Sequence, residues 1–154
     1  MESGGAIDGD TAWRLHRTRP DRGTIHGTAI AFRGRGLLIL GPAGSGKTGL
    51  AAELMIMGAG LVSDDLVVLT SNGSVLIAAR PEGAASAMEL RGLGILTVSQ
   101  ARPTPITAVL HLVTSPTRLP DEATVTLLDH IMPLLRLPSR HDTAAKVALW
   151  LTAA

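Results

Sequence analysis

Cysteine is absent from this chain of 154 residues, so disulfides and thiolate metal sites are excluded. Aromatic residues are nearly absent as well: two Trp, one Phe and no Tyr leave few side chains on which nucleic-acid bases could stack. No apolar run reaches the roughly 18 residues of a membrane-crossing helix. The first residues lack the basic and then apolar pattern of a secretory signal. We therefore expect a soluble cytoplasmic protein with no nucleic-acid and no membrane partner.

Charge of either sign is sparse and nearly balanced. The 14 basic and 13 acidic residues leave a formal net charge of +1, which does not suit a dedicated nucleic-acid binder. A hydrophobic content of 45% in a chain of this length predicts one folded domain. Because the first residues are rich in glycine and polar groups, we expect a flexible segment over residues 1–23 and the folded domain over residues 24–154.

One loop motif is far more specific than the composition. Residues 41–48 match G-x-x-x-x-G-K-[ST], the loop that wraps the phosphates of a nucleotide. Given 17 Gly and only two Lys in the chain, roughly 0.004 chance matches to this pattern are expected. Lysine is expected to reach the β- and γ-phosphates, and threonine to offer its hydroxyl to Mg²⁺. The predicted nucleotide-binding residues are Gly41, Pro42, Ala43, Gly44, Ser45, Gly46, Lys47 and Thr48.

The sequence around this loop is what a phosphate-binding loop requires. The apolar run at 37–40 predicts the preceding strand, and the residues after the loop predict a helix that ends near Gly58 or Gly60. The pair Asn72-Gly73 favours a hairpin turn between two apolar strands. Because hairpins flank the loop, the expected fold is an α/β P-loop-containing domain with a mixed β-sheet.

Two adjacent carboxylates are the first candidates for chemistry beside the loop. Asp64 and Asp65 follow an apolar, strand-like segment, 17 and 18 residues after Lys47. Phosphoryl transfer needs carboxylates to hold a metal ion and to accept a proton. Adjacent residues of an ideal strand point to opposite faces, so either the strand ends there or the two carboxylates have different roles. A solvated turn with no catalytic role is the alternative.

Three other polar residues are ambiguous on these grounds. Glu89 and Arg91 lie in an apolar segment broken by glycines, where they could form a mere surface ion pair. A lone histidine such as His26 is more typical of a structural or exposed position. A GTPase is disfavoured because the Asn-Lys-x-Asp guanine reader is absent, and a transporter ATPase because Leu-Ser-Gly-Gly-Gln is absent.

Four stretches together resemble the catalytic, C-terminal domain of the bacterial HPr kinase/phosphorylase family. The last of them resembles the family's own signature, and the likeness covers about residues 24–100. The chain is similar to the short versions of the family that are associated with alphaproteobacteria, since about two dozen residues precede His26. The stretches are Ile25-His26-Gly27, the loop 41–48, Leu61-Val62-Ser63-Asp64-Asp65 and Met88-Glu89-Leu90-Arg91-Gly92-Leu93-Gly94-Ile95.

The resemblance implies a fold similar to phosphoenolpyruvate carboxykinase and a protein serine kinase that uses ATP and Mg²⁺. Its acceptor would be HPr, the phosphocarrier of the bacterial sugar phosphotransferase system. Many members also remove the phosphate with inorganic phosphate and release pyrophosphate, and long members form hexamers, so a homo-oligomer is a further expectation. The resemblance implies catalytic roles for Asp64, Asp65, His26 and Lys47, with Asp64 as the proton acceptor, and a metal held by Thr48, Asp65 and Glu89.

Two other functions fit the loop alone. A non-catalytic ATP-binding regulatory module would act on a partner through the arginine-rich segment at 14–22. A small-molecule P-loop kinase would transfer phosphate to a metabolite instead of a protein. An assay with HPr as the acceptor separates both from the protein serine kinase.

Overall fold

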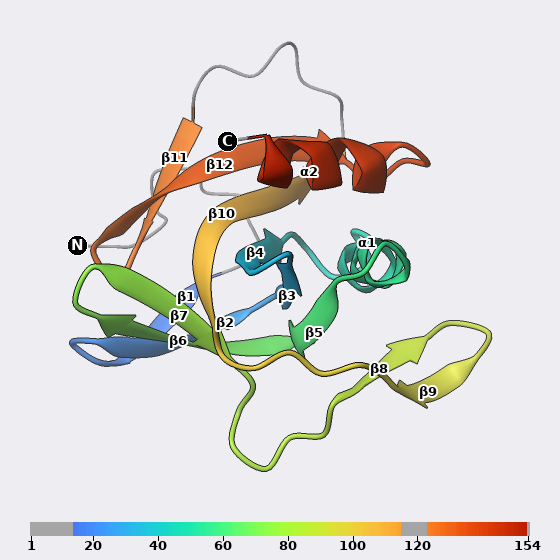
Figure 1. Cartoon of the computed structure of the whole chain (residues 1–154). Helices are drawn as coiled ribbons and strands as arrows, with labels where there is room; N and C mark the ends of the chain where they lie inside the picture. Colours follow the sequence, from blue (N-terminus) through green and yellow to red (C-terminus); the bar gives the residue numbers. More distant parts are fainter. Residues whose placement is uncertain (1–13, 115–122, 154) are drawn as a thin grey trace.

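A computed structural model describes residues 14–114 and 123–153, most of which lie in β-strands (Figure 1). The strands form one large, curved sheet and a separate two-stranded hairpin. The two helices of the described residues pack into the same core cluster, on one face of the sheet. No helix in this part of the chain is long and apolar enough to cross a lipid bilayer.

Most elements are short strands; one helix lies between β4 and β5, and the other follows β12. The strands are β1 (Leu15–Arg19), β2 (Arg22–His26), β3 (Thr28–Phe32), β4 (Arg35–Leu40), β5 (Gly60–Ser63), β6 (Leu66–Asn72), β7 (Val75–Ala79), β8 (Ala87–Leu90), β9 (Gly94–Thr97), β10 (Thr104–Val113), β11 (Ala123–Leu127) and β12 (His130–Pro138). The helices are α1 (Lys47–Ile56) and α2 (Thr143–Thr152).

Strand β10 joins the two halves of the large sheet. Its first residues pair antiparallel with β7, and its later residues run parallel to β4 and β12. The strand order is β1-β2-β6-β7-β10-β4-β3-β5, with β12 and then β11 branching from β10. Parallel and antiparallel pairs therefore occur in one sheet, and the expected mixed α/β fold is confirmed.

Strand β3 lies between β4 and β5 and is antiparallel to both. Strands β4 and β5 therefore run in the same direction and end at the same edge of the sheet, where β3 begins. The phosphate-loop motif follows the end of β4, and Asp64 and Asp65 follow the end of β5. The sheet thus brings the two strongest sequence features of the chain together.

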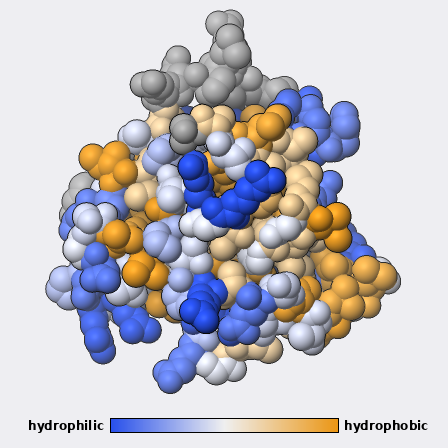
Figure 2. Space-filling view, in the orientation of Figure 1, coloured by the Kyte–Doolittle hydropathy of each residue, from blue (hydrophilic) through white to orange (hydrophobic). Residues whose placement is uncertain are grey.

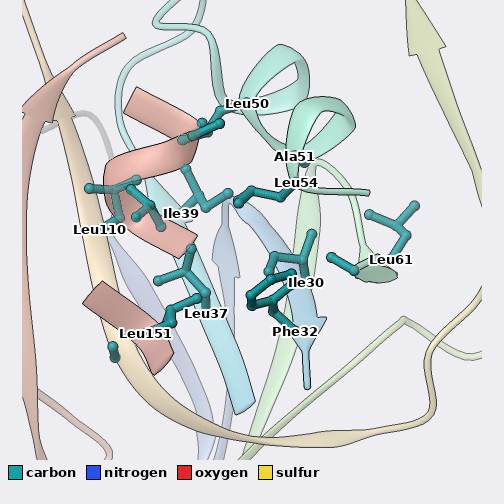
Figure 3. Close-up of a cluster of buried hydrophobic side chains, with 14 of the residues drawn as sticks. Ile30, Phe32, Leu37, Ile39, Leu50, Ala51, Leu54, Leu61, Leu110 and Leu151 are labelled. Carbon is teal, nitrogen blue, oxygen red and sulfur yellow. The ribbon is translucent and has the colours of Figure 1, made fainter. Parts of the chain in front are cut away.

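The apolar run at 37–40 is buried on both faces of the sheet, as its unbroken hydrophobic sequence predicts. Leu38 and Leu40 belong to the core cluster shared with β2, β6 and β7. Leu37 and Ile39 point to the opposite face, where they join the cluster closed by the two helices (Figure 3). Burial on both faces fixes the strand that leads into the loop.

Both helices lie where the sequence predicts them. Helix α1 ends at Ile56, and Gly58 follows with φ 114, a left-handed conformation that glycine adopts without strain. Helix α2 begins directly after Asp142, which the sequence of the tail at 142–151 predicts as the N-cap of a helix. The Asp142 side chain makes no capping hydrogen bond and instead pairs with Lys146 at 3.1 Å.

Regular structure differs from the expectation at two places. Strands β1 and β2 form an antiparallel hairpin, and β1 with the first residues of β2 lies in the segment 1–23 that we expected to be flexible. Strand β2 holds the hairpin to the sheet because it also pairs with β6. Residues 1–13 of that segment lie outside the described residues. Residues 87–97 form the β8–β9 hairpin, in a segment whose only turn signal is its glycines.

The close approach of β10 to β4 predicts a strict requirement for glycine at position 36. A Cβ on Gly36 would lie 2.5 Å from the Pro105 carbonyl oxygen, so Gly36→Ala should destabilise the protein by about 1–3 kcal/mol in denaturant unfolding. Gly49→Ala is the matched control, because a Cβ on the α1 residue Gly49 meets nothing within 4 Å and should stabilise by up to about 1 kcal/mol. Equal stability of the Gly36→Ala and wild-type proteins would contradict the close contact.

Candidate active site

The phosphate-loop motif forms a tight turn between β4 and α1. Gly44 and Gly46 have φ 80 and φ 102, conformations that side chains with a Cβ rarely adopt. Gly46 is the N-cap of α1, and its carbonyl accepts the first helical hydrogen bond, from the Leu50 amide at 2.9 Å. The loop therefore exposes backbone amides at the positive end of a helix, which is an arrangement suited to phosphate groups.

Lys47 folds back over the loop from the first residue of α1. Its Nζ donates hydrogen bonds to the carbonyl oxygens of Gly41 at 2.8 Å and Pro42 at 3.2 Å. Burial lowers the pKa of the Lys47 ammonium, while the negative charges of Asp65 and Asp64 oppose that shift. The ammonium group is thus held at the loop, within the field of both carboxylates.

Asp64 is fixed by two hydroxyl groups. Thr28 Oγ1 donates to Asp64 Oδ1 at 2.7 Å, and Thr48 Oγ1 lies 3.2 Å from Oδ1 and 3.3 Å from Oδ2. Thr28 is completely buried at the start of β3, and Thr48 lies in the first turn of α1. The carboxylate therefore links the end of β5 to the helix that carries the loop.

Asp65 is separated from Asp64 by a sharp turn of the backbone. Asp65 has φ 74, an uncommon left-handed conformation for a residue other than glycine, and its side chain is exposed. The turn is closed by the Leu66 amide, which donates to the Asp64 carbonyl at 2.9 Å, and by the Ser63 hydroxyl, which donates to the Leu66 carbonyl at 2.6 Å. The strand ends at Ser63, so the alternation of side chains between the two faces of a strand does not decide where the two carboxylates point.

The oxygen atoms beside the loop suit a hard divalent cation. Thr48 and Asp64 bring a hydroxyl and a carboxylate together, which are oxygen ligands of the kind that Mg²⁺ takes. Within residues 14–114 and 123–153, no group of three or more His, Asp or Glu side chains converges as a metal site. Mg²⁺ commonly uses one or two carboxylates and completes its shell with substrate phosphates and water. The residues present therefore fit Mg²⁺ that arrives with a nucleotide.

His26 lies close to the carboxylates along the backbone. It is the last residue of β2 and pairs with Leu66, the first residue after the Asp64-Asp65 turn. The next amide, of Gly27, donates to the Asp65 carbonyl at 3.1 Å. The exposed imidazole is thus carried by the same edge of the sheet as the two acids.

Glu89 lies on the β8–β9 hairpin, outside the large sheet. Its neighbour Met88 is buried in the helix-side core cluster and anchors the hairpin, whereas Glu89 itself is exposed. Arg91 is also exposed, in the turn that connects the two strands. No Asp64–Asp65–Glu89 cluster is formed among the described residues.

The same hairpin displays apolar side chains to solvent. Leu93 and Ile95 are 71% and 74% exposed, and Leu96 is 38% exposed. Figure 2 shows hydrophobic surface on the side of the molecule where Figure 1 places the hairpin. Exposed apolar side chains grouped on one hairpin are typical of surfaces that contact other proteins.

Two residues of this site were not singled out from the sequence. Thr28 is a β-branched residue at the start of a strand, and nothing in its local sequence distinguishes it from a core position. Ser139 follows β12, and a Cβ on Gly46 would lie 2.6 Å from its hydroxyl, so the segment after β12 packs directly on the phosphate loop. Both contacts join residues far apart in the chain.

Known proteins are similar to this chain in sequence and in fold. The family "HPr Serine kinase C-terminal domain" matches residues 20–104. A protein named HPr kinase/phosphorylase from Xylella fastidiosa (strain M12) is 35% identical over an alignment of 144 residues. The alignment covers 82% of this chain and 46% of that protein. Another of that name, from Xanthomonas campestris pv. campestris (strain B100), is 42% identical over 88 residues, which are 56% of this chain and 28% of that protein.

A solved structure agrees with the sequence comparison. The HPr(Ser) kinase/phosphatase from Coxiella burnetii superposes with a TM-score of 0.74 at 23% identity, over 81% of this chain and 86% of that chain. At this identity the superposition shows a shared fold. The chain matches less than half the length of the curated relatives, whereas the family match includes β2 to β9 and both acids. The chain therefore belongs to the HPr serine kinase C-terminal domain family.

Proposed function

We propose that this protein is an ATP- and Mg²⁺-dependent protein serine kinase that acts on HPr or an HPr-like phosphocarrier. One observation carries the proposal: a phosphate loop and an Asp-Asp turn meet at one sheet edge in a chain of this family. The names of the relatives, HPr kinase/phosphorylase, supply the acceptor. Incubation with ATP, Mg²⁺ and purified HPr should produce phosphoserine on HPr; its absence, with ATP still bound, would favour a regulatory module or a small-molecule kinase.

The loop residues would hold the nucleotide. Backbone amides of the loop, other than that of Pro42, which has no N–H, would donate to phosphate oxygens. The Lys47 ammonium would exchange its carbonyl partners for the β- and γ-phosphates. Thr48 and Asp64 would hold Mg²⁺, which neutralises phosphate charge when it is bound. The contact between the two side chains supports this role, because both already face one another.

The geometry favours Asp65, and not Asp64, as the acceptor of the serine proton. Our sequence-based expectation gave that role to Asp64 and put Asp65 nearer the metal. Asp64 is engaged by Thr28 and Thr48, whereas Asp65 is exposed to an approaching acceptor. Glu89, on a separate hairpin, would join the metal only if the hairpin moves toward the loop. We therefore assign Asp64 to the metal side and Asp65 to the acceptor side.

The proposed transfer needs one proton acceptor and one leaving group. The serine hydroxyl gives its proton to the Asp65 carboxylate while its oxygen bonds to the γ-phosphorus, and the bond to the oxygen that bridges to the β-phosphate breaks. ADP leaves with that bridging oxygen. His26, carried beside the Asp65 turn, would stabilise the transferred phosphate. In the phosphorylase reaction, an oxygen of inorganic phosphate would bond to the phosphorus of phosphoserine while the bond from phosphorus to the serine oxygen breaks. Asp65 would pass the proton of the attacking phosphate to that serine oxygen, and pyrophosphate would be released.

The loop assignment predicts that Lys47→Ala loses nucleotide affinity. Removing hydrogen bonds from a charged donor to phosphate should weaken MgATP binding by at least about tenfold in calorimetry. Lys146→Ala is the matched control, because Lys146 is the other lysine of the chain and forms an exposed ion pair with Asp142. Unchanged affinity in Lys47→Ala would place the nucleotide elsewhere.

Because the two acids have different proposed roles, we expect different defects when each is changed to asparagine. Asp65→Asn keeps a residue that tolerates the left-handed backbone, so it should lower kcat for HPr phosphorylation by at least about 10²-fold and leave MgATP affinity intact. Asp64→Asn should instead weaken binding of MgATP relative to metal-free ATP. The exposed loop residue Glu82, changed to Gln, serves as the control. If only Asp64→Asn lowered kcat and its MgATP binding were normal, Asp64 would be the acceptor of the serine proton.

If the acceptor is a protein, we expect the exposed apolar β8–β9 hairpin to contact it. Ile95→Ser should raise KM for HPr severalfold, because it removes apolar contact surface from the hairpin. The MgATP affinity should not change, because the Ile95 side chain is 74% exposed and adds little to the core. Ile131→Ser is the matched control, since Ile131 is 69% exposed on β12 and should have no effect. Equal KM values in the two variants would exclude the hairpin as an acceptor contact.

A further inference from the structure

We infer that Thr28 is a positioning residue that assigns Asp64 to the metal side of the site. The inference rests on the proposed function, because it concerns how the chain binds MgATP. Thr28 is the first residue of β3 and has no exposed surface. A buried hydroxyl needs a hydrogen-bond partner, and its partner here is the Asp64 carboxylate at 2.7 Å.

The register of the sheet places the two side chains together. Ala29 on β3 pairs antiparallel with Ser63, the last residue of β5, so Thr28 and Asp64 are the residues just beyond this pair on the two segments. The pairing of β3 with β5 therefore brings Thr28 close to Asp64. The hydrogen bond between their side chains forms directly beside the last paired residues of the two strands.

The hydrogen bond also orients the carboxylate. The Thr28 hydroxyl donates to Asp64 Oδ1. The Thr48 hydroxyl lies almost equally far from Asp64 Oδ1 and Oδ2, at 3.2 and 3.3 Å. If Asp64 rotated away from Thr48, the buried Thr28 hydroxyl would lose its acceptor. Thr28 thus keeps Asp64 turned toward the hydroxyl of α1 and leaves Asp65 as the carboxylate that faces solvent.

The test is the coupling between Mg²⁺ and ATP, measured by calorimetry of ATP with Mg²⁺ and of ATP with a chelator. Thr28→Val removes the hydroxyl and keeps the shape, so it should weaken MgATP binding about 10- to 100-fold while metal-free ATP binds as in the wild type. Thr28→Ser keeps the hydroxyl and should restore the affinity for MgATP. Thr28→Ala replaces the Val variant if that variant does not fold.

Two further comparisons separate positioning from a general loss of structure. Thr104→Val removes another buried threonine hydroxyl, which donates to the Arg102 carbonyl at 2.6 Å, and should leave the Mg²⁺ coupling intact. In an Asp64→Asn background, Thr28→Val should have no further effect, because Thr28 acts through Asp64.

The outcomes distinguish the positioning role from the proposed function. If wild-type protein binds MgATP but Thr28→Val (or Thr28→Ala) binds it equally well, the positioning role is wrong and the kinase proposal stands. If both ATP and MgATP weaken equally in Thr28→Val, Thr28 has a structural role only. If the wild type binds neither form of ATP, the proposed function itself fails.

Discussion

The antiparallel pairing of β3 with both of its neighbours is the constraint on which the site depends. Because β4 and β5 run in the same direction on either side of β3, the phosphate loop and the Asp-Asp turn emerge at one edge. Thr28, at the start of β3, then touches Asp64 across the β5 register, and Asp64 touches Thr48 on α1. Burial of β4 on both faces holds the strand that leads into the loop in place, because its side chains pack into two core clusters.

Local backbone conformation gives two adjacent acids different surroundings. A strand that continued past Ser63 would send the two side chains to opposite faces, whereas the turn at Asp65 ends the strand at the active edge. The left-handed conformation of Asp65 is strained for a residue other than glycine, and such strain persists only where neighbouring contacts enforce it. Here the Gly27 amide binds the Asp65 carbonyl and the Ser63 hydroxyl closes the turn, so the sheet itself enforces the separation.

Sequence reasoning predicted the features that are encoded locally. The loop, the apolar strands beside it, the Asn72-Gly73 hairpin and the C-terminal helix depend on residues close in the chain, and all four lie where expected. The β1–β2 hairpin was missed because its stability comes from pairing with β6, about 45 residues away. Thr28 was missed for a similar reason: a threonine beside an aspartate 36 residues distant leaves no local pattern. The contrast between Asp64 and Asp65 likewise depends on a turn that is held by contacts from β2 and β3.

The state of Lys47 shows how the loop prepares for phosphate. An ammonium group only donates hydrogen bonds, and Lys47 donates them to two carbonyl oxygens of its own loop. Phosphate oxygens can replace these carbonyls one for one, so binding exchanges hydrogen bonds and leaves no buried charge unpaired. The nearby acids oppose the loss of its proton that burial favours, which keeps the cation available. The two carboxylates beside the loop thus help Lys47 to meet phosphate as an ammonium ion.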